Sequence, residues 1–347
     1  MTCQHRLMST VAFVAGCAVL GAVAGCTSGP GAPLGGPSSP AGTIAASTGN
    51  RTAAPGPATS SAGDSSPTGT APSHHAAIGP TGHVAGNLTV SGLARSYHLY
   101  VPAKAASSGP VALMVALHGG GGSGAHFEQI SGFDQLAGSN NFIVAYPDAL
   151  QPPGGRVTTW NAGTCCGWAA STNVDDVGFI KALITTLSGQ YRIDPARVYV
   201  TGHSNGGMLA YRIACQLAGT VAAIGVQSAT LQYSPCHPSQ PVSLLHIHGT
   251  ADTQVPLLGG HGTGTSKANF TPALQAATTI ATADGCHSSP TTGPDPTLAH
   301  AQLNTWTGCP TGIGVQFATV TGLAHTWQTT SATQIWNFLA AHPRPNR

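Results

Sequence analysis

Apolar residues in this chain gather in short continuous runs, and helical segments lie between the runs. Such runs are typical of strands that are buried on both faces of a parallel sheet. The predicted strands, which follow a hairpin at 87–101, are 111–117, 142–146, 197–201, 242–247 and 315–320. The predicted helices are 125–136, 176–187, 204–217, 271–283 and 331–341. This alternation predicts one α/β domain at 87–347, with a mostly parallel central sheet and helices on both faces.

The first 86 residues lack this pattern. Residues 1–26 have a positive start at Arg6 and an apolar run that is too short to span a membrane comfortably. The run ends in Val-Ala-Gly-Cys, which resembles a bacterial lipobox, so we expect a lipoprotein signal with lipid on Cys26. Ordinary signal cleavage near Ala24 is the alternative. Residues 27–86 are mostly Gly, Pro, Ser, Thr and Ala, which predicts a disordered tether.

Charge and cysteine content limit the partners and the compartment. Charged residues make up 6% of the chain and the net charge is +2, with no basic cluster, so nucleic acid is not an expected partner. Nine cysteines are present, and removing Cys3 and Cys17 with the signal and Cys26 to lipid leaves six. An even number suits disulfides in an oxidising compartment, so we expect an extracytoplasmic protein, lipid-anchored on the outer face of the cell membrane or secreted.

The segment 197–210 carries the strongest chemical signal. A β-branched run ends in Gly202-His203-Ser204-Asn205-Gly206, and a helical run follows at once. Strand, tight turn and helix around G-x-S-x-G form the setting of a nucleophilic serine, whose neighbours must be small. Ser204 is therefore the predicted nucleophile, and a Gly-Ser turn that caps a helix is the alternative.

A serine nucleophile needs a histidine base and a carboxylate, which in α/β-hydrolases follow the serine in the order acid, then histidine. Asp252 lies in a loop just after the strand 242–247, whereas Asp284 ends a helix and Asp295 lies in a Gly/Pro loop. His325 follows the strand 315–320 by a short loop. Asp252 and His325 are the predicted partners of Ser204.

Backbone N–H donors are needed for the oxyanion that forms on the substrate. Four glycines follow His118 directly after the first long buried strand, which is the place of the HGGG-type loop. We expect the N–H groups of Asn205 and Gly120 to be the donors, with Gly119 or Gly121 as an alternative to Gly120. His118 is expected to be structural.

Seven motifs in order resemble the polyhydroxybutyrate depolymerase/feruloyl esterase family, which is close to carbohydrate esterase family one. They are 117–124, 146–148, 174–179, 193–198, 202–208, 248–256 and 322–327. The resemblance implies an α/β-hydrolase fold, a triad at Ser204, Asp252 and His325, and membership that includes actinobacterial lipoproteins. One departure is that Thr253 and Gln254 follow the acid where relatives often have Asp-Pro.

The six remaining cysteines allow 15 pairings. We favour Cys215–Cys236 and Cys286–Cys309, each closing a local excursion, which leaves Cys165–Cys166 as a vicinal bridge. A Cys-Cys metal site is the alternative, but no ligand cluster accompanies it, and no metal or cofactor is expected. The tryptophans expected to line an acyl pocket are Trp160, Trp168 and Trp327.

These features predict an exported serine esterase that forms an acyl-enzyme. The expected substrates are small or oligomeric carboxylic esters of feruloyl-carbohydrate, acetyl-carbohydrate or hydroxybutyrate type. The alternatives are acyl transfer to a cell-envelope sugar and a non-catalytic envelope-binding lipoprotein. We expect a monomer that contacts the membrane through its lipid.

Overall fold

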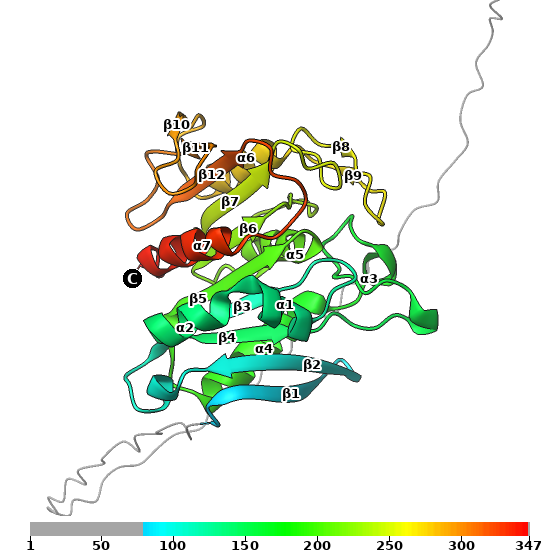
Figure 1. The fold of residues 1–347 in the computed structure, drawn as a ribbon, viewed down its shortest axis with the longest axis vertical. Coiled ribbons are helices and arrows are strands. Elements are labelled where there is room, and N and C mark those ends of the chain that lie inside the picture. Colours follow the sequence, from blue (N-terminus) through cyan, green and yellow to red (C-terminus); the bar gives the residue numbers. More distant parts are fainter. Residues whose placement is uncertain (1–78, 346–347) are drawn as a thin grey trace, which may run out of the picture. The chain divides into compact units, whose positions relative to one another are not determined.

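A ten-stranded sheet forms the centre of the computed structural model, which describes residues 79–345 (Figure 1). The strand order is β1-β2-β4-β3-β5-β6-β7-β12-β11-β10. The strands are β1 (Gly82–Val90), β2 (Leu93–Val101), β3 (Val111–Leu117), β4 (Ile143–Pro147), β5 (Ile193–His203), β6 (Ala223–Gln227), β7 (Ser243–Gly249), β10 (Thr291–Pro294), β11 (Ala301–Thr305) and β12 (Val315–Val320). The six central strands, from β4 to β12 in this order, are parallel, and antiparallel strands extend both edges. The fold is the predicted mostly parallel α/β sheet.

Helices cover both faces of this sheet. One core packs against α4 (Asp176–Gln190), α5 (Asn205–Gln216) and α6 (Ala273–Ala283). The other packs against α1 (Gly124–Ser131), α2 (Phe133–Asn140) and α7 (Thr329–Ala341). A short helix α3 (Gly167–Ser171) and a small hairpin of β8 (Gly260–His261) and β9 (Asn269–Phe270) lie in loops of the chain. Both faces of β3 and β7 are therefore buried, as their continuous apolar runs predict.

One predicted element is wrong, and one central strand is missing from the prediction. The predicted helix at 125–136 is two helices, because Gly132 adopts φ 80° and separates α1 from α2. The central strand β6 was not predicted, since its run is short and contains Gly225. That glycine is required, because a Cβ there would lie 2.6 Å from the Ile335 side chain of α7.

The folded domain begins earlier than the boundary predicted at residue 87. Strand β1 starts at Gly82 and pairs with β2 along its whole length. Gly79 N–H donates to the Gln190 carbonyl, and the Tyr191 hydroxyl donates to the Pro80 carbonyl. The Gly-rich composition before residue 87 therefore conceals an edge strand. The signal peptide, Cys26 and nearly all of the predicted tether lie outside the described residues.

The structure contains the three disulfides expected from the sequence, Cys165–Cys166, Cys215–Cys236 and Cys286–Cys309. Disulfides persist in oxidising compartments and are rare in the cytosol, so the domain is of an extracytoplasmic type. Within residues 79–345, none of the helices combines the length and the apolar character that a membrane crossing requires.

Asp284, at the end of α6, is a buried carboxyl group with incomplete hydrogen bonding. Its Oδ1 accepts from the Val242 N–H, and its Oδ2 has no partner in the described part of the chain. Burial raises the pKa of Asp284 to about 7. Because this pKa exceeds the value of an unfolded aspartate, ionisation of Asp284 opposes folding as the pH rises.

Replacing Asp284 with Asn should therefore stabilise the protein increasingly between about pH 4 and pH 7, with little further change above. The substitution should raise the free energy of unfolding by about 2–4 kcal/mol more at pH 7.5 than at pH 4.5. Urea unfolding of both proteins at the two pH values measures this difference. Asp295→Asn is the matched control, because hydrogen bonds from Thr297 and Leu298 outweigh burial and lower the pKa of Asp295. A pH-independent effect of Asp284→Asn would contradict the assignment.

Candidate active site

Ser204 lies at the tip of the turn between β5 and α5, in a backbone conformation that is unusual for a non-glycine residue. Its φ is 55° and its ψ is −125°. The turn is tight enough that a Cβ at Gly202 would lie 2.5 Å from the Gly206 carbonyl carbon. A Cβ at Gly206 would collide with the Leu117 carbonyl oxygen of β3. The glycines of the predicted motif are therefore required by backbone packing, and they lift the Ser204 hydroxyl clear of the sheet.

The three side chains predicted to act together meet at the carboxyl edge of the sheet. His325 Nε2 lies 2.9 Å from Ser204 Oγ, and His325 Nδ1 lies 2.8 Å from Asp252 Oδ2. An ionised carboxylate only accepts hydrogen bonds, so Nδ1–H donates to Asp252 and Nε2 accepts from the serine hydroxyl. This is the arrangement in which an imidazole can take the serine proton.

Asp252 is held in one orientation by its own loop. Its Oδ1 accepts from the Gln254 N–H at 3.0 Å and from the Val255 N–H at 2.9 Å, which leaves Oδ2 for His325. Burial alone would raise the pKa of Asp252, but the hydrogen bonds from His325 and Val255 outweigh it and lower the pKa. The other acids that follow Ser204, Asp284 and Asp295, cap a helix and close a turn.

A buried chain of hydrogen bonds that sequence reasoning missed lies behind the acid. Tyr211 Oη lies 2.7 Å from His246 Nδ1, His246 Nε2 lies 2.9 Å from His248 Nδ1, and His248 Nε2 lies 2.8 Å from the Val255 carbonyl. We call Tyr211, His246 and His248 the relay. His248 Nε2 is also 3.6 Å from Asp252 Oδ2. The pair His246-x-His248 at the end of a buried strand is the sequence feature that could have indicated the relay.

The direction of every bond in the relay follows from its last member. A carbonyl only accepts, so His248 Nε2 carries the proton and its Nδ1 accepts from His246, which in turn accepts from the Tyr211 hydroxyl. Burial lowers the pKa of both histidines and raises that of Tyr211, which keeps the imidazoles neutral and the phenol protonated. The relay therefore directs an N–H group at the loop of Asp252.

The residues predicted to supply the oxyanion donors line the same cavity as Ser204. Gly119, Gly120 and Asn205 are among its lining residues. Gly121 is not available as a donor, because its N–H donates to the Thr158 carbonyl at 2.8 Å. His118 lies beneath the loop, where Nδ1–H donates to the Gly119 carbonyl and Nε2 accepts from the Ala149 N–H. These contacts leave Gly120 and Gly119 as the loop candidates and give His118 a structural place.

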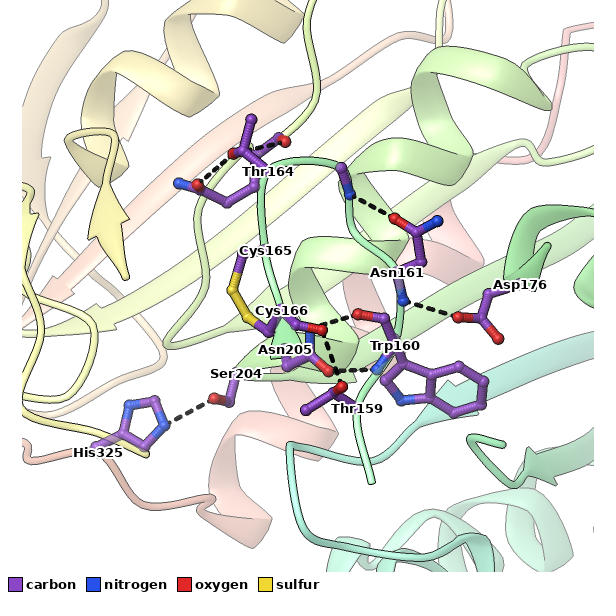
Figure 2. The surroundings of a disulfide bond; sticks show 12 residues. Thr159, Trp160, Asn161, Thr164, Cys165, Cys166, Asp176, Ser204, Asn205 and His325 are labelled. Carbon is purple, nitrogen blue, oxygen red and sulfur yellow. Dashed lines mark hydrogen bonds between the residues drawn. A yellow bond between two sulfur atoms is a disulfide. The ribbon is translucent and has the colours of Figure 1, made fainter. Parts of the chain in front are cut away.

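A row of polar contacts behind Asn205 supports the turn at Ser204 (Figure 2). Asn205 Oδ1 accepts from the Trp160 N–H at 2.6 Å, and its Nδ2 donates to the Trp160 carbonyl at 3.1 Å. The next N–H, of Asn161, donates to Asp176 at 2.7 Å. Asp176 is paired at 2.7 Å with Arg95, and both side chains are buried. This row, from Arg95 to Asn205, is named the buttress below.

The segment 174–179 behaves as predicted, as the start of a core helix. The Asp175 side chain caps α4 by accepting from the Gly178 N–H. Asp176, in contrast, belongs to the buttress, a role that no local pattern indicated. Burial raises its pKa although Arg95 acts in the opposite direction.

A cavity of about 510 Å³ opens beside Ser204. Its apolar wall comes from Val157, Trp168, Met208, Val255 and Phe270, and Cys166 of the vicinal disulfide also lines it. Figure 2 shows this disulfide next to Asn205, where the Cys166 carbonyl accepts from the Thr159 hydroxyl. The cavity beside Ser204 therefore has an apolar wall, of a kind that suits an acyl group.

Of the three tryptophans expected in this wall, only Trp168 lies there. Trp160 is completely buried, and its Nε1–H donates to the His118 carbonyl. Trp327 packs edge-on against Phe127 and donates to the Ser131 carbonyl. The prediction that Trp160 and Trp327 line the pocket is therefore wrong. Both lie near the site in sequence, but their rings turn away from the cavity.

Part of this chain is similar to known proteins. Residues 95–251 match the family described as esterase PHB depolymerase. Feruloyl esterase B of Piromyces equi is 33% identical over 153 residues, which are 43% of this chain and 27% of that protein. The bifunctional acetylxylan esterase/xylanase XynS20E of Neocallimastix patriciarum is 26% identical over 243 residues, which are 70% of this chain and 32% of that protein. The chain thus spans about a third or less of the length of these two relatives.

The fold is also similar to that of a solved esterase structure. The structure of an acetyl xylan esterase from Aspergillus awamori matches with a TM-score of 0.55 at 18% identity, and it covers 74% of this chain and 99% of that chain. The likeness shows a shared α/β-hydrolase fold. With the family match at 95–251, it confirms the resemblance expected from the motifs. Residues 95–251 are therefore similar to the esterase PHB depolymerase family, and the domain has an α/β-hydrolase fold.

Proposed function

We propose that the domain is a serine esterase that hydrolyses carboxylic esters through an acyl-enzyme. The observation that carries the proposal is the unbroken path from Ser204 Oγ through His325 to Asp252, with contacts of 2.9 and 2.8 Å. The names of the relatives, feruloyl and acetylxylan esterases, support the same class of reaction.

In the proposed reaction, Ser204 Oγ attacks the ester carbonyl carbon while its proton passes to His325 Nε2. The imidazolium is stabilised by the Asp252 carboxylate, and the negative carbonyl oxygen accepts from the N–H groups of Asn205 and Gly120. When the C–O bond of the ester breaks, His325 returns the proton to the departing alcohol. Water then attacks the acyl-serine by the same route and releases the acid.

The proposed substrates are small or oligomeric esters with an acyl group that fits the apolar side of the cavity. Feruloyl or acetyl groups on carbohydrate and hydroxybutyrate oligomers meet this description. The enzyme is proposed to be exported and monomeric, with lipid on Cys26 holding it to the outer face of the cell membrane, and the disulfides of the domain are compatible with that location.

Replacing Ser204 with Ala should lower kcat/KM for p-nitrophenyl butyrate by at least about 10³-fold, because the reaction loses its nucleophile. Labelling by a fluorophosphonate probe should disappear with it. Ser139→Ala on the exposed face of α2 is the matched control and should keep both. A folded Ser204→Ala protein with undiminished turnover would refute the proposed role.

The substrate class is tested by comparing methyl ferulate, acetylated xylan oligomers and hydroxybutyrate oligomers with wild type and Ser204→Ala. We expect hydrolysis of at least one class by the wild type alone. Adding a sugar acceptor separates the two reactions, because a hydrolase gives free acid whereas a transferase gives a new sugar ester in preference to it.

The relay predicts a contrast between two variants of His248. Glutamine keeps an N–H that can reach the Val255 carbonyl, whereas leucine removes it, so His248→Leu should lower kcat about 10- to 100-fold with KM little changed. His248→Gln should keep most of the wild-type kcat. Steady-state kinetics, with melting temperatures to confirm folding, measure the split. Equal kcat values for the two variants would contradict a positioning role of the relay.

A further inference from the structure

A second cluster of chemically active side chains lies where α1 and α2 cover the first hairpin. His83 comes from β1, His98 from β2, Glu128 from α1 and Asp134 from α2. In the antiparallel register His83 faces Tyr100, two residues from His98, so both imidazoles lie on the same face of the hairpin. These four side chains, named the hairpin cluster, are not among the residues lining the cavity beside Ser204.

The donor atoms of the hairpin cluster converge. His83 Nδ1 lies 2.8 Å from Glu128 Oε1 and 3.8 Å from Asp134 Oδ2. The ligand atoms of these three residues all lie within 4.8 Å of one another. His98 Nδ1 lies 3.9 Å from the second oxygen of Glu128. Ligands placed about 2.0–2.2 Å from a tetrahedral zinc ion are about 3.4 Å apart, so small rotations would bring these atoms into a coordination shell.

The charges in the cluster also favour a cation. Glu128 is the only glutamate of the chain, and it lies beside another carboxylate although the chain has only 10 acidic residues. Burial and the neighbouring Glu128 raise the pKa of Asp134. Neither acid forms an ion pair with a lysine or arginine within the described residues, where imidazoles are their only ion-pair partners.

One ligand is oriented from behind, as metal ligands commonly are. Tyr146 donates its hydroxyl hydrogen to Asp134 Oδ1 at 2.7 Å, and burial raises the pKa of Tyr146 well above its usual value, which preserves the donor. Asp134 Oδ2 is then left facing His83. The cluster is half-buried on the side of the helices, and His83 forms its exposed side.

We propose that His83, Glu128 and Asp134 bind one divalent transition-metal ion, with His98 as the fourth ligand. Two imidazoles with two carboxylates suit Zn²⁺, Mn²⁺, Co²⁺ or Ni²⁺ better than Ca²⁺ or Mg²⁺, which prefer oxygen ligands alone. The ion would join the edge hairpin to α1, the helix that directly follows the glycine loop. Its role is structural, and no step of ester hydrolysis passes through it.

The test uses the full chain without a histidine tag, after treatment with EDTA and removal of the chelator. Titration calorimetry with ZnCl₂ should give one site, and a zinc concentration about 100-fold above Kd should raise Tm by several degrees. His83→Ala and Glu128→Gln should each weaken zinc binding at least about 10-fold. His261→Ala, which removes an exposed histidine on β8, is the matched control and should bind as the wild type does.

Esterase activity separates this proposal from the proposed function, because Glu128→Gln should bind zinc more weakly and keep its turnover of p-nitrophenyl butyrate. CaCl₂ in place of ZnCl₂ should give a much smaller rise in Tm. The proposal is overturned if the wild type shows no stoichiometric zinc site. It is equally overturned if His83→Ala and Glu128→Gln bind zinc as tightly as His261→Ala.

Discussion

The candidate site depends on one strained residue, because Ser204 stands at the tip of its turn with a positive φ. That conformation is costly for a residue with a side chain and persists only when its surroundings enforce it. Here β5 enters the turn, α5 leaves it, and glycines at 202 and 206 let β3 and the helix approach within contact distance. The turn places Ser204 and Asn205 beside the same cavity, so the proposed nucleophile and one proposed oxyanion donor come from neighbouring residues of one turn.

Buried polar groups then hold the surroundings of that turn. The buttress runs from Arg95 on β2 to the Asn205 side chain, and the relay runs from Tyr211 on α5 to the loop of Asp252. A buried ion pair adds little net stability compared with apolar packing, but leaving one partner alone is expensive. In a chain that is only 6% charged, the pair Arg95–Asp176 is therefore best understood as fixing a loop in one position.

A feature of this structure could be predicted from the sequence when residues close together in the chain determine it. The strand 315–320, the G-x-S-x-G turn and the cysteine pairs could be predicted because apolar runs, turn chemistry and short loop closures are all properties of neighbouring residues. Strand β6 could not be predicted, because the reason for its small residues is the packing of α7. That helix lies more than a hundred residues later in the chain. The same limit applies to Trp160 and Trp327, since ring orientation is decided by distant partners. The hairpin cluster draws one residue from each of four elements, so no spacing in the sequence indicated it.

The relay has a further consequence for where protons can move. A chain of hydrogen bonds conducts a proton only if each member can hand one on and accept another, but a carbonyl ends this chain and has no proton to give. The two imidazoles therefore form a fixed row of dipoles, and the positive end of this row lies at the loop of Asp252.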